Sequence, residues 1–219
     1  MRNLAVAAVL FVTACGSDAA PAPDAHQTQQ IAQGTGAATP LALQLYALAG
    51  RTGIPDADAS FSVDLDGFHV DASVTTPTPD AAAYHFDVHG MAGDTVVDAT
   101  ADLTVTRLTA YDRQISGTLD LSSTARAFDQ TLALGAATHL TYDPTTNVLR
   151  GSLAAGIDAT LDGASIHIED AALTVTETGA VHLAIDATDA SAGCFAIDTT
   201  TGEATAVDLT VCEAAPSVR

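Results

Sequence analysis

The sequence contains no lysine and no tryptophan, and it has only three cysteines. Its seven basic residues are all arginines, against 27 aspartates and glutamates, so the formal net charge is −20. Such a surface repels nucleic-acid phosphates and anionic lipid headgroups, which excludes both as partners and leaves cations and basic proteins. Without lysine there is no P-loop, and GxSxG and HExxH motifs are also missing. We therefore expect a protein that is not an enzyme and uses no cofactor.

Aromatic residues are also scarce, at 5% of the chain. A lipid-facing β-barrel needs aromatic girdles at both membrane interfaces, so the composition argues against that class. The only long apolar run lies at residues 4–11, after Arg2 and before the small residues Thr13 and Ala14. Eight residues give about 12 Å of helix, far less than the ~30 Å hydrocarbon core. This layout is typical of an export signal rather than a transmembrane helix.

The end of this signal, Val12-Thr13-Ala14-Cys15, resembles the lipobox of bacterial lipoproteins. The resemblance covers about the first 15 residues and implies that Cys15 is the lipidated first residue of the mature chain, with cleavage after Ala14. Gly16 stands where an aspartate would mark inner-membrane retention in that family. The resemblance therefore implies a bacterial cell-envelope protein, held by an acyl anchor on Cys15, with the outer membrane favoured over the inner.

The next segment, residues 16–38, is rich in Ala, Gly, Pro and Gln and has no bulky apolar periodicity. We expect a signal over 1–14, the lipidated cysteine and a flexible tether over 15–38, and one domain over 39–219. Thr39, Pro40 and Gly50 suit the N-cap, first turn and C-terminal end of a short helix over 40–49. A strand carrying alternate leucines is the alternative for these residues.

From residue 59 onward the hydrophobic period is two, which predicts an all-β domain. Two-residue turns at Asp66-Gly67 and Asp162-Gly163 each place the flanking apolar side chains on one face. Further hairpins are expected at residues 177–180, 142–148 and 197–203. The pattern predicts a single antiparallel up-and-down meander of about 11–13 strands, forming a curled sheet or barrel, with a β-sandwich as the alternative. The expected inner face comprises Phe61, Val63, Leu65, Phe86, Leu103, Val105, Leu119, Leu132, Leu153, Ile157, Ile166, Leu173, Val175 and Leu183.

The remaining two cysteines, Cys194 and Cys212, flank the last predicted strands. In an exported chain we expect them to form a disulfide. A tight turn at 197–203 would offset them by six residues, whereas direct pairing would require a wider loop.

The candidate for a metal site is His85-Phe86-Asp87-Val88-His89, in which His85, Asp87 and His89 share the polar face of a strand. Other histidines also fall on polar-face positions, which favours ordinary solvated side chains, so no metal is expected. We predict a lipid-anchored envelope protein that acts as a binding or structural surface module for an envelope partner. The alternatives are a carrier holding an apolar ligand inside the sheet and a metal-dependent enzyme using this face. Close packing of the inner face would favour the binding module.

Overall fold

The computed structural model describes residues 23–92, 94–109, 112–125, 128–134, 140–161, 163–185 and 193–213. The predicted signal and Cys15 lie outside these residues, as does Asp162 of the second predicted turn. No helix in the described ranges is both long enough and apolar enough to cross a membrane.

The described residues form twelve strands and two helices. The helices are α1 (Ala25–Thr52) and α2 (Leu209–Glu213). The strands are β1 (Ala59–Leu65), β2 (Phe68–Thr78), β3 (Ala81–Ala92), β4 (Thr95–Arg107), β5 (Arg113–Ala125), β6 (Phe128–Leu134), β7 (Leu140–Asp143), β8 (Val148–Leu161), β9 (Ala164–Val175), β10 (Val181–Ile185), β11 (Gly193–Ile197) and β12 (Ala204–Val207).

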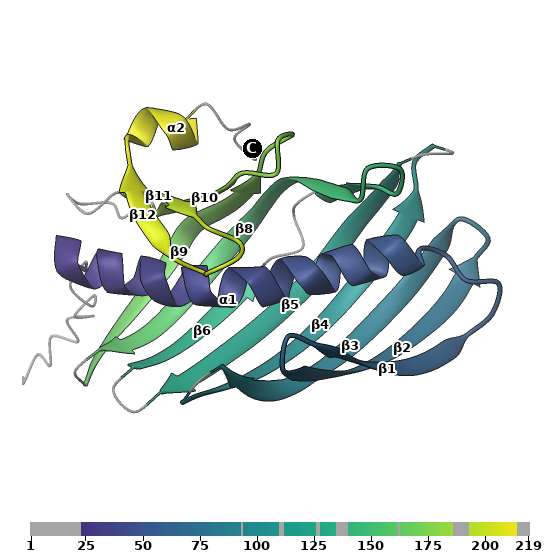
Figure 1. Ribbon diagram of the computed structural model, residues 1–219, viewed down its shortest axis with the longest axis horizontal. Coiled ribbons are helices and arrows are strands. Elements are labelled where there is room, and N and C mark those ends of the chain that lie inside the picture. The colour runs from purple at the N-terminus through teal and green to yellow at the C-terminus, as the bar shows by residue number, and fades with distance from the viewer. Residues whose placement is uncertain are drawn as a thin grey trace, which may run out of the picture.

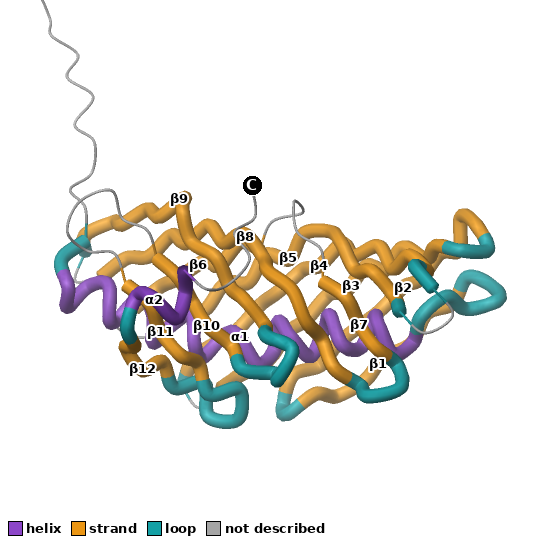
Figure 2. Tube along the Cα trace, turned by 90° about the horizontal axis from the view of Figure 1, so that it is seen from above, coloured by secondary structure: helices purple, strands orange, loops and turns teal. Residues whose placement is uncertain are grey.

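The strands form one antiparallel sheet in which neighbours in sequence are neighbours in space. Its order is β1-β2-β3-β4-β5-β6-β8-β9-β10-β11-β12. The short strand β7 also lies between β5 and β8, where it pairs with a different part of each strand from β6. The sheet curls around α1, which lies along its concave side (Figures 1 and 2). Strands β1 and β12 are not paired with each other in the described chain. The predicted meander is confirmed as an open curled sheet, and neither the closed barrel nor the sandwich is formed.

Turn residues fix the register of this sheet. Asp66 and Gly67 have φ values of 47° and 95°, as a type I′ turn requires, and Leu65 pairs with Phe68. The hairpin of β8 and β9, whose turn contains Gly163, has the same register, with Leu161 opposite Ala164. Because side chains alternate between faces, this register sends the apolar side chains to the concave side.

Helix α1 corrects the predicted tether and the predicted short helix. It begins at Ala25 rather than at residue 40, and Pro40 lies inside it. The side chain of Asp24 accepts a hydrogen bond from the Gln27 backbone N–H, and the Gln27 side-chain oxygen accepts one from the Asp24 backbone N–H, which forms a capping box. Ile31 in the first half of the helix is fully buried. Residues 25–38 are therefore part of the folded domain.

Small residues let the helix lie close to the strands. A Cβ atom on Gly36 would come 2.5 Å from the Gly202 carbonyl oxygen, and one on Gly50 would come 2.5 Å from Cγ of Tyr142. Neither position has room for a larger side chain.

The concave side is closely packed. The predicted inner-face residues are buried except Phe61, Val63 and Leu65 of the edge strand β1, which are partly buried. Among the fully buried side chains are the large rings of Tyr46 and Phe86. Helix α1 thus contributes buried side chains to the same core as the strands.

Cys194 and Cys212 form the predicted disulfide, with 5.9 Å between their Cα atoms. The tight turn is kept, because Cys194 of β11 pairs with Val207 of β12 rather than with Cys212. Helix α2 then brings Cys212 back to β11. The wider loop is therefore not needed. The chain turns back through helix α2 after β12, and this return brings Cys212 next to Cys194 although the two residues are not register partners.

Candidate functional site

The convex face of the sheet carries polar side chains in continuous rows that cross the strands. In the longest row, each residue is the register partner of the next from β1 to β9. This row, called the long row below, is Asp64, His69, His89, Asp98, Ser122, Thr131, Asp158 and His167. It contains no lysine or arginine, so its charge comes from aspartates and histidines alone.

A second row runs parallel to the long row, two residues along each strand. It consists of Ser62, Asp71, Asp87, Thr100 and Asp120. Between the two rows lies a depression of about 390 Å³ that extends from β2 to β6. Asp87, Asp98 and Asp120 line it together with His89. A third row adds Ser60, Ser73, His85, Asp102 and Thr118.

Each histidine of the first hairpins faces an aspartate across one strand pair. His69 Nδ1 lies 2.9 Å from Asp64 Oδ1, and His85 Nδ1 lies 2.8 Å from Asp102 Oδ1. His89 makes the same contact with Asp98. Counted from the type I′ turn, Asp64 and His69 form a non-hydrogen-bonded pair, in which opposite side chains come closest.

The hairpin of β8 and β9 repeats the arrangement. His167 Nδ1 lies 2.5 Å from Asp158 Oδ1, and its Nε2 lies 3.2 Å from Glu169 Oε1. The two positions again follow a two-residue turn in the same phase. The same histidine and aspartate pair therefore occurs at the same position relative to the turn in two separate hairpins.

Neighbouring carboxylates raise the proton affinity of three histidines, His69, His85 and His167. The hydrogen bond with Asp64 raises the pKa of His69, and the bond with Asp102 raises that of His85. For His167, the hydrogen bonds with Asp158 and then with Glu169 raise the pKa. Protonation of these three histidines would cancel part of the negative charge of the rows.

The three candidate metal ligands, His85, Asp87 and His89, are only partly brought together. His85 and Asp87 are neighbours on the convex face, with 3.3 Å between Nε2 and Oδ2. His89 contacts Asp98 on β4 instead. In the ranges that the structure describes, no three His, Cys, Asp or Glu side chains form a group that could hold a metal ion.

The described arginines lie away from the rows, near the C-terminal end of α1. Arg51 is in the last turn of the helix, and Arg113 donates to the carbonyl oxygens of Gly50 and Arg51. These cations face the negative end of the helix dipole. Arg107 opposes Arg113 and also pairs with Asp80 at 3.3 Å.

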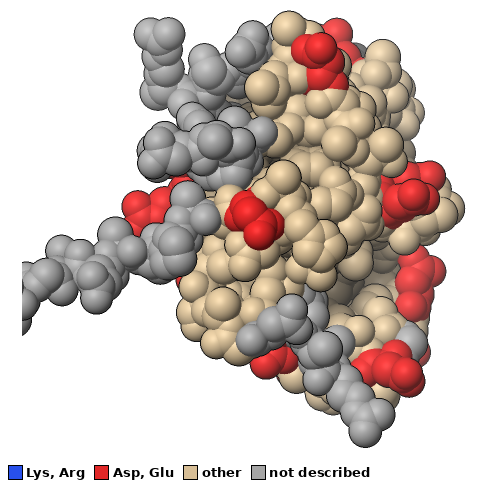
Figure 3. Space-filling model, turned by 90° about the vertical axis from the view of Figure 1, so that its left-hand side faces the viewer, with Lys and Arg blue, Asp and Glu red and all other residues tan. Residues whose placement is uncertain are grey.

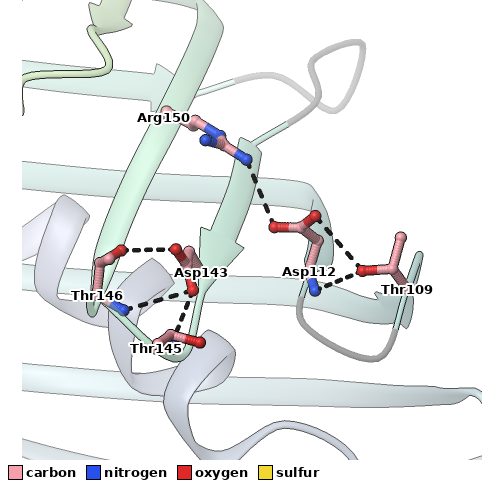
Figure 4. Close-up of polar contacts among 6 residues, drawn as sticks. All are labelled: Thr109, Asp112, Asp143, Thr145, Thr146 and Arg150. Atoms are coloured by element: carbon pink, nitrogen blue, oxygen red, sulfur yellow. Dashed lines mark hydrogen bonds and ion pairs between the residues drawn. The ribbon is translucent and has the colours of Figure 1, made fainter.

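Arg150, the remaining described arginine, is used at the β7–β8 hairpin (Figure 4). Its Nη2 lies 3.4 Å from Oδ1 of Asp112. In the adjoining turn, hydrogen bonds from Thr146 and Thr145 lower the pKa of Asp143. Both carboxylates therefore have local structural roles.

The end of the molecule at which α1 begins carries negative charge. Figure 3 looks at that end, where red acidic groups are separated by uncharged surface and no basic group is seen among the coloured residues. Charge is therefore unevenly distributed in the described domain. The rows and this end carry acidic groups without arginine, and the arginines gather at the C-terminal end of α1.

The histidine and aspartate pairs could have been found from the sequence. The register predicted for the two Asp-Gly hairpins already places Asp64 opposite His69 and Asp158 opposite His167. The remaining strand pairings, which join these hairpins into the long row, depend on loops without such turn signals.

No known family model, no curated protein and no solved structure matches this chain.

Proposed function

We propose that the protein is a lipid-anchored module of the bacterial cell envelope that binds a cationic protein partner across the convex face of its sheet. The observation that carries the proposal is the long row, which crosses the sheet from β1 to β9 with aspartates and histidines and without lysine or arginine. Low-dielectric strands beneath it and the neighbouring acidic row strengthen its attraction for cationic groups. Aspartates recognise arginine through charge-assisted hydrogen bonds.

The closely packed concave side supports binding over the carrier alternative. A carrier needs a cavity among the inner-face residues, and α1 fills that position with Ile31, Leu45 and Tyr46, all fully buried. The proposal is one of binding, because the rows present many similar polar groups on an open face. Their groups are solvated and repeat across the sheet.

The anchor belongs to the same proposal. Cys15 would carry the acyl chains and hold the domain at the membrane, preferentially the outer one. Because the described domain already includes the helix cap at Asp24, at most residues 16–23 would separate it from the lipid. Eight residues span at most about 28 Å when fully extended, so the domain would stay close to the membrane surface. Replacing Cys15 with Ser should abolish fatty-acid labelling and release the protein from the membrane fraction.

The binding proposal is tested with charge-matched variants of the full chain. The double variant Asp98→Asn/Asp120→Asn removes two charges from the depression on the convex face. The control Glu177→Gln/Glu203→Gln removes two charges from exposed positions outside the strands. We expect the first to weaken binding of a fluorescent deca-arginine peptide at least tenfold and the second to change it less than twofold. Equal weakening by both variants would mean that net charge, and not the rows, binds the probe.

The natural partner is then sought by photo-cross-linking in the native membrane. A cross-linking residue at Thr100, in the second row, should capture a protein with an exposed basic segment. The same residue at Thr178, in the exposed turn after β9, is the control position. Capture that is equal at both positions, or that persists in Asp98→Asn/Asp120→Asn, would contradict the proposal.

A further inference from the structure

The two edges of the open sheet are protected very differently. At one edge, β12 has only four residues and is covered by α1. Gln29 and Gln33 of the helix donate to the Ala204 carbonyl oxygen at 3.2 and 2.7 Å. The disulfide to Cys212 also ties the following helix to this side. Edge strands left open promote unwanted pairing, and short length and a covering helix are two ways to prevent it.

The other edge, β1, has none of these protections. It runs for seven residues without proline, and no described strand pairs with its free side. Its register with β2 shows no bulge. In Figure 1 it forms the last strand of the sheet, below α1, at the end of the meander opposite β12. An edge of this kind can accept an additional strand.

The hairpin geometry identifies which peptide groups are free. A type I′ turn closes on a hydrogen-bonded pair, here Leu65 and Phe68, and hydrogen-bonded pairs then alternate along the strands. Phe61, Val63 and Leu65 therefore bond to β2. The N–H and C=O groups of Ser60, Ser62 and Asp64 point away from β2, so three donors and three acceptors are available to a partner strand.

The side chains of β1 specify the chemistry of that partner. On the concave side, Phe61, Val63 and Leu65 are only partly buried, although they join the main apolar core. On the convex side, Asp64 and the adjacent Asp71 are exposed. A complementary strand therefore presents apolar residues to the first set and basic residues to the second, in alternation.

We infer that β1 is a strand-addition site for an extended segment of another protein in which apolar and basic residues alternate. Charge selects this occupant over a second copy of the chain. Each copy carries a formal charge of −20, and Asp56, Asp58, Asp64 and Asp66 all lie on or beside β1. The inference goes beyond the proposed function, because pairing uses the peptide groups of β1 and not the rows.

The test uses the full chain in detergent and a labelled eight-residue peptide that alternates Arg and Val. The control peptide has the same sequence but carries N-methyl groups on alternate residues, those whose N–H groups would face β1. We expect the unmodified peptide to bind at least tenfold more tightly by fluorescence anisotropy. Hydrogen exchange should show slower exchange in residues 59–65 when it binds. Equal affinity of the two peptides, or unchanged exchange in β1, would overturn the inference.

Variants of Ser62 separate edge pairing from attraction by charge. Ser62→Pro removes a donor that faces away from β2, whereas Ser62→Ala keeps it. We expect at least a tenfold loss of affinity in the first and less than a twofold change in the second, with thermal unfolding confirming that both are folded. If Ser62→Pro does not fold, the N-methylated peptide tests the same donors in the unaltered chain.

Two further outcomes are distinguished. If Asp98→Asn/Asp120→Asn abolishes peptide binding and Ser62→Pro leaves it intact, the rows bind the peptide and the strand-addition site is refuted. If β1 is protected from exchange without peptide, and the protection rises with protein concentration, a second copy occupies the edge and the proposed occupant is wrong.

Discussion

Replacing Ile31 with Ala tests whether the first half of α1 is part of the core. Ile31 is fully buried in the helix. The change removes three carbon atoms, which at ~0.8 kcal/mol for each CH₂ costs about 2.4 kcal/mol of transfer free energy. The cavity left by the side chain raises this cost, whereas the higher helix propensity of alanine lowers it by a few tenths of a kcal/mol. We expect the free energy of unfolding to fall by about 2 to 4 kcal/mol.

The assay is urea unfolding followed by far-UV circular dichroism, with the midpoint shifted and the m-value unchanged. His26→Ala is the matched control, since His26 is exposed in the same helix. It should change the free energy by no more than about 0.5 kcal/mol. If Ile31→Ala is equally mild, residues 25–38 do not pack against the sheet, and the tether predicted from their composition would be the better description.

Three other measurements test the core, the disulfide and the histidine pairs. Leu153→Ala should lower the free energy of unfolding by about 2 to 5 kcal/mol without altering binding of deca-arginine, because Leu153 is buried on the concave side. Replacing Cys194 and Cys212 with Ala should lower it by about 3 kcal/mol, since the disulfide closes a loop between residues 18 apart; reducing agent should destabilise the wild type and leave the variant unchanged. Because hydrogen bonds to aspartate raise the pKa of His69 and His167 in the fold, their stabilisation is complete below the unfolded value of about 6.5 and is lost as pH rises through the higher folded value. His69→Gln/His167→Gln should therefore lose less stability than the wild type between pH 6 and pH 8.5, and an identical loss would exclude these pairs as its source.

The strands were predictable because their turns are encoded by neighbouring residues. Asp66-Gly67 fixes the backbone locally, and alternation then decides the face of every residue in both strands. The antiparallel meander, the inner face and the turn at Asn147, which has a φ of 58°, followed from such local signals. Whether the sheet would close into a barrel could not be predicted from such signals, because this depends on how the whole curled sheet packs against α1.

The first half of α1 was mispredicted for a physical reason. Its segment has few large apolar side chains, so composition indicated a chain that could not pack. Gly36 and the neighbouring alanines instead permit a very close approach to the turn at Gly202, 166 residues further along. Tertiary contact of this kind overrides local propensity, and nothing in the local pattern reveals it.

The position of α1 also determines the order in which the domain can assemble. The helix is the first element of the described chain, and its Gln33 bonds to Ala204, 171 residues away. During synthesis, the helix leaves the ribosome long before that strand. Contacts of such long range make folding slow, and they leave the helix without its final partner until almost the entire chain has arrived. A nascent chain lacking its last twenty residues would keep most of the sheet, but Gln33 and Gly36 of α1 would lack their partners in the β11–β12 hairpin, and such incompletely packed chains are exposed to chaperones and proteases.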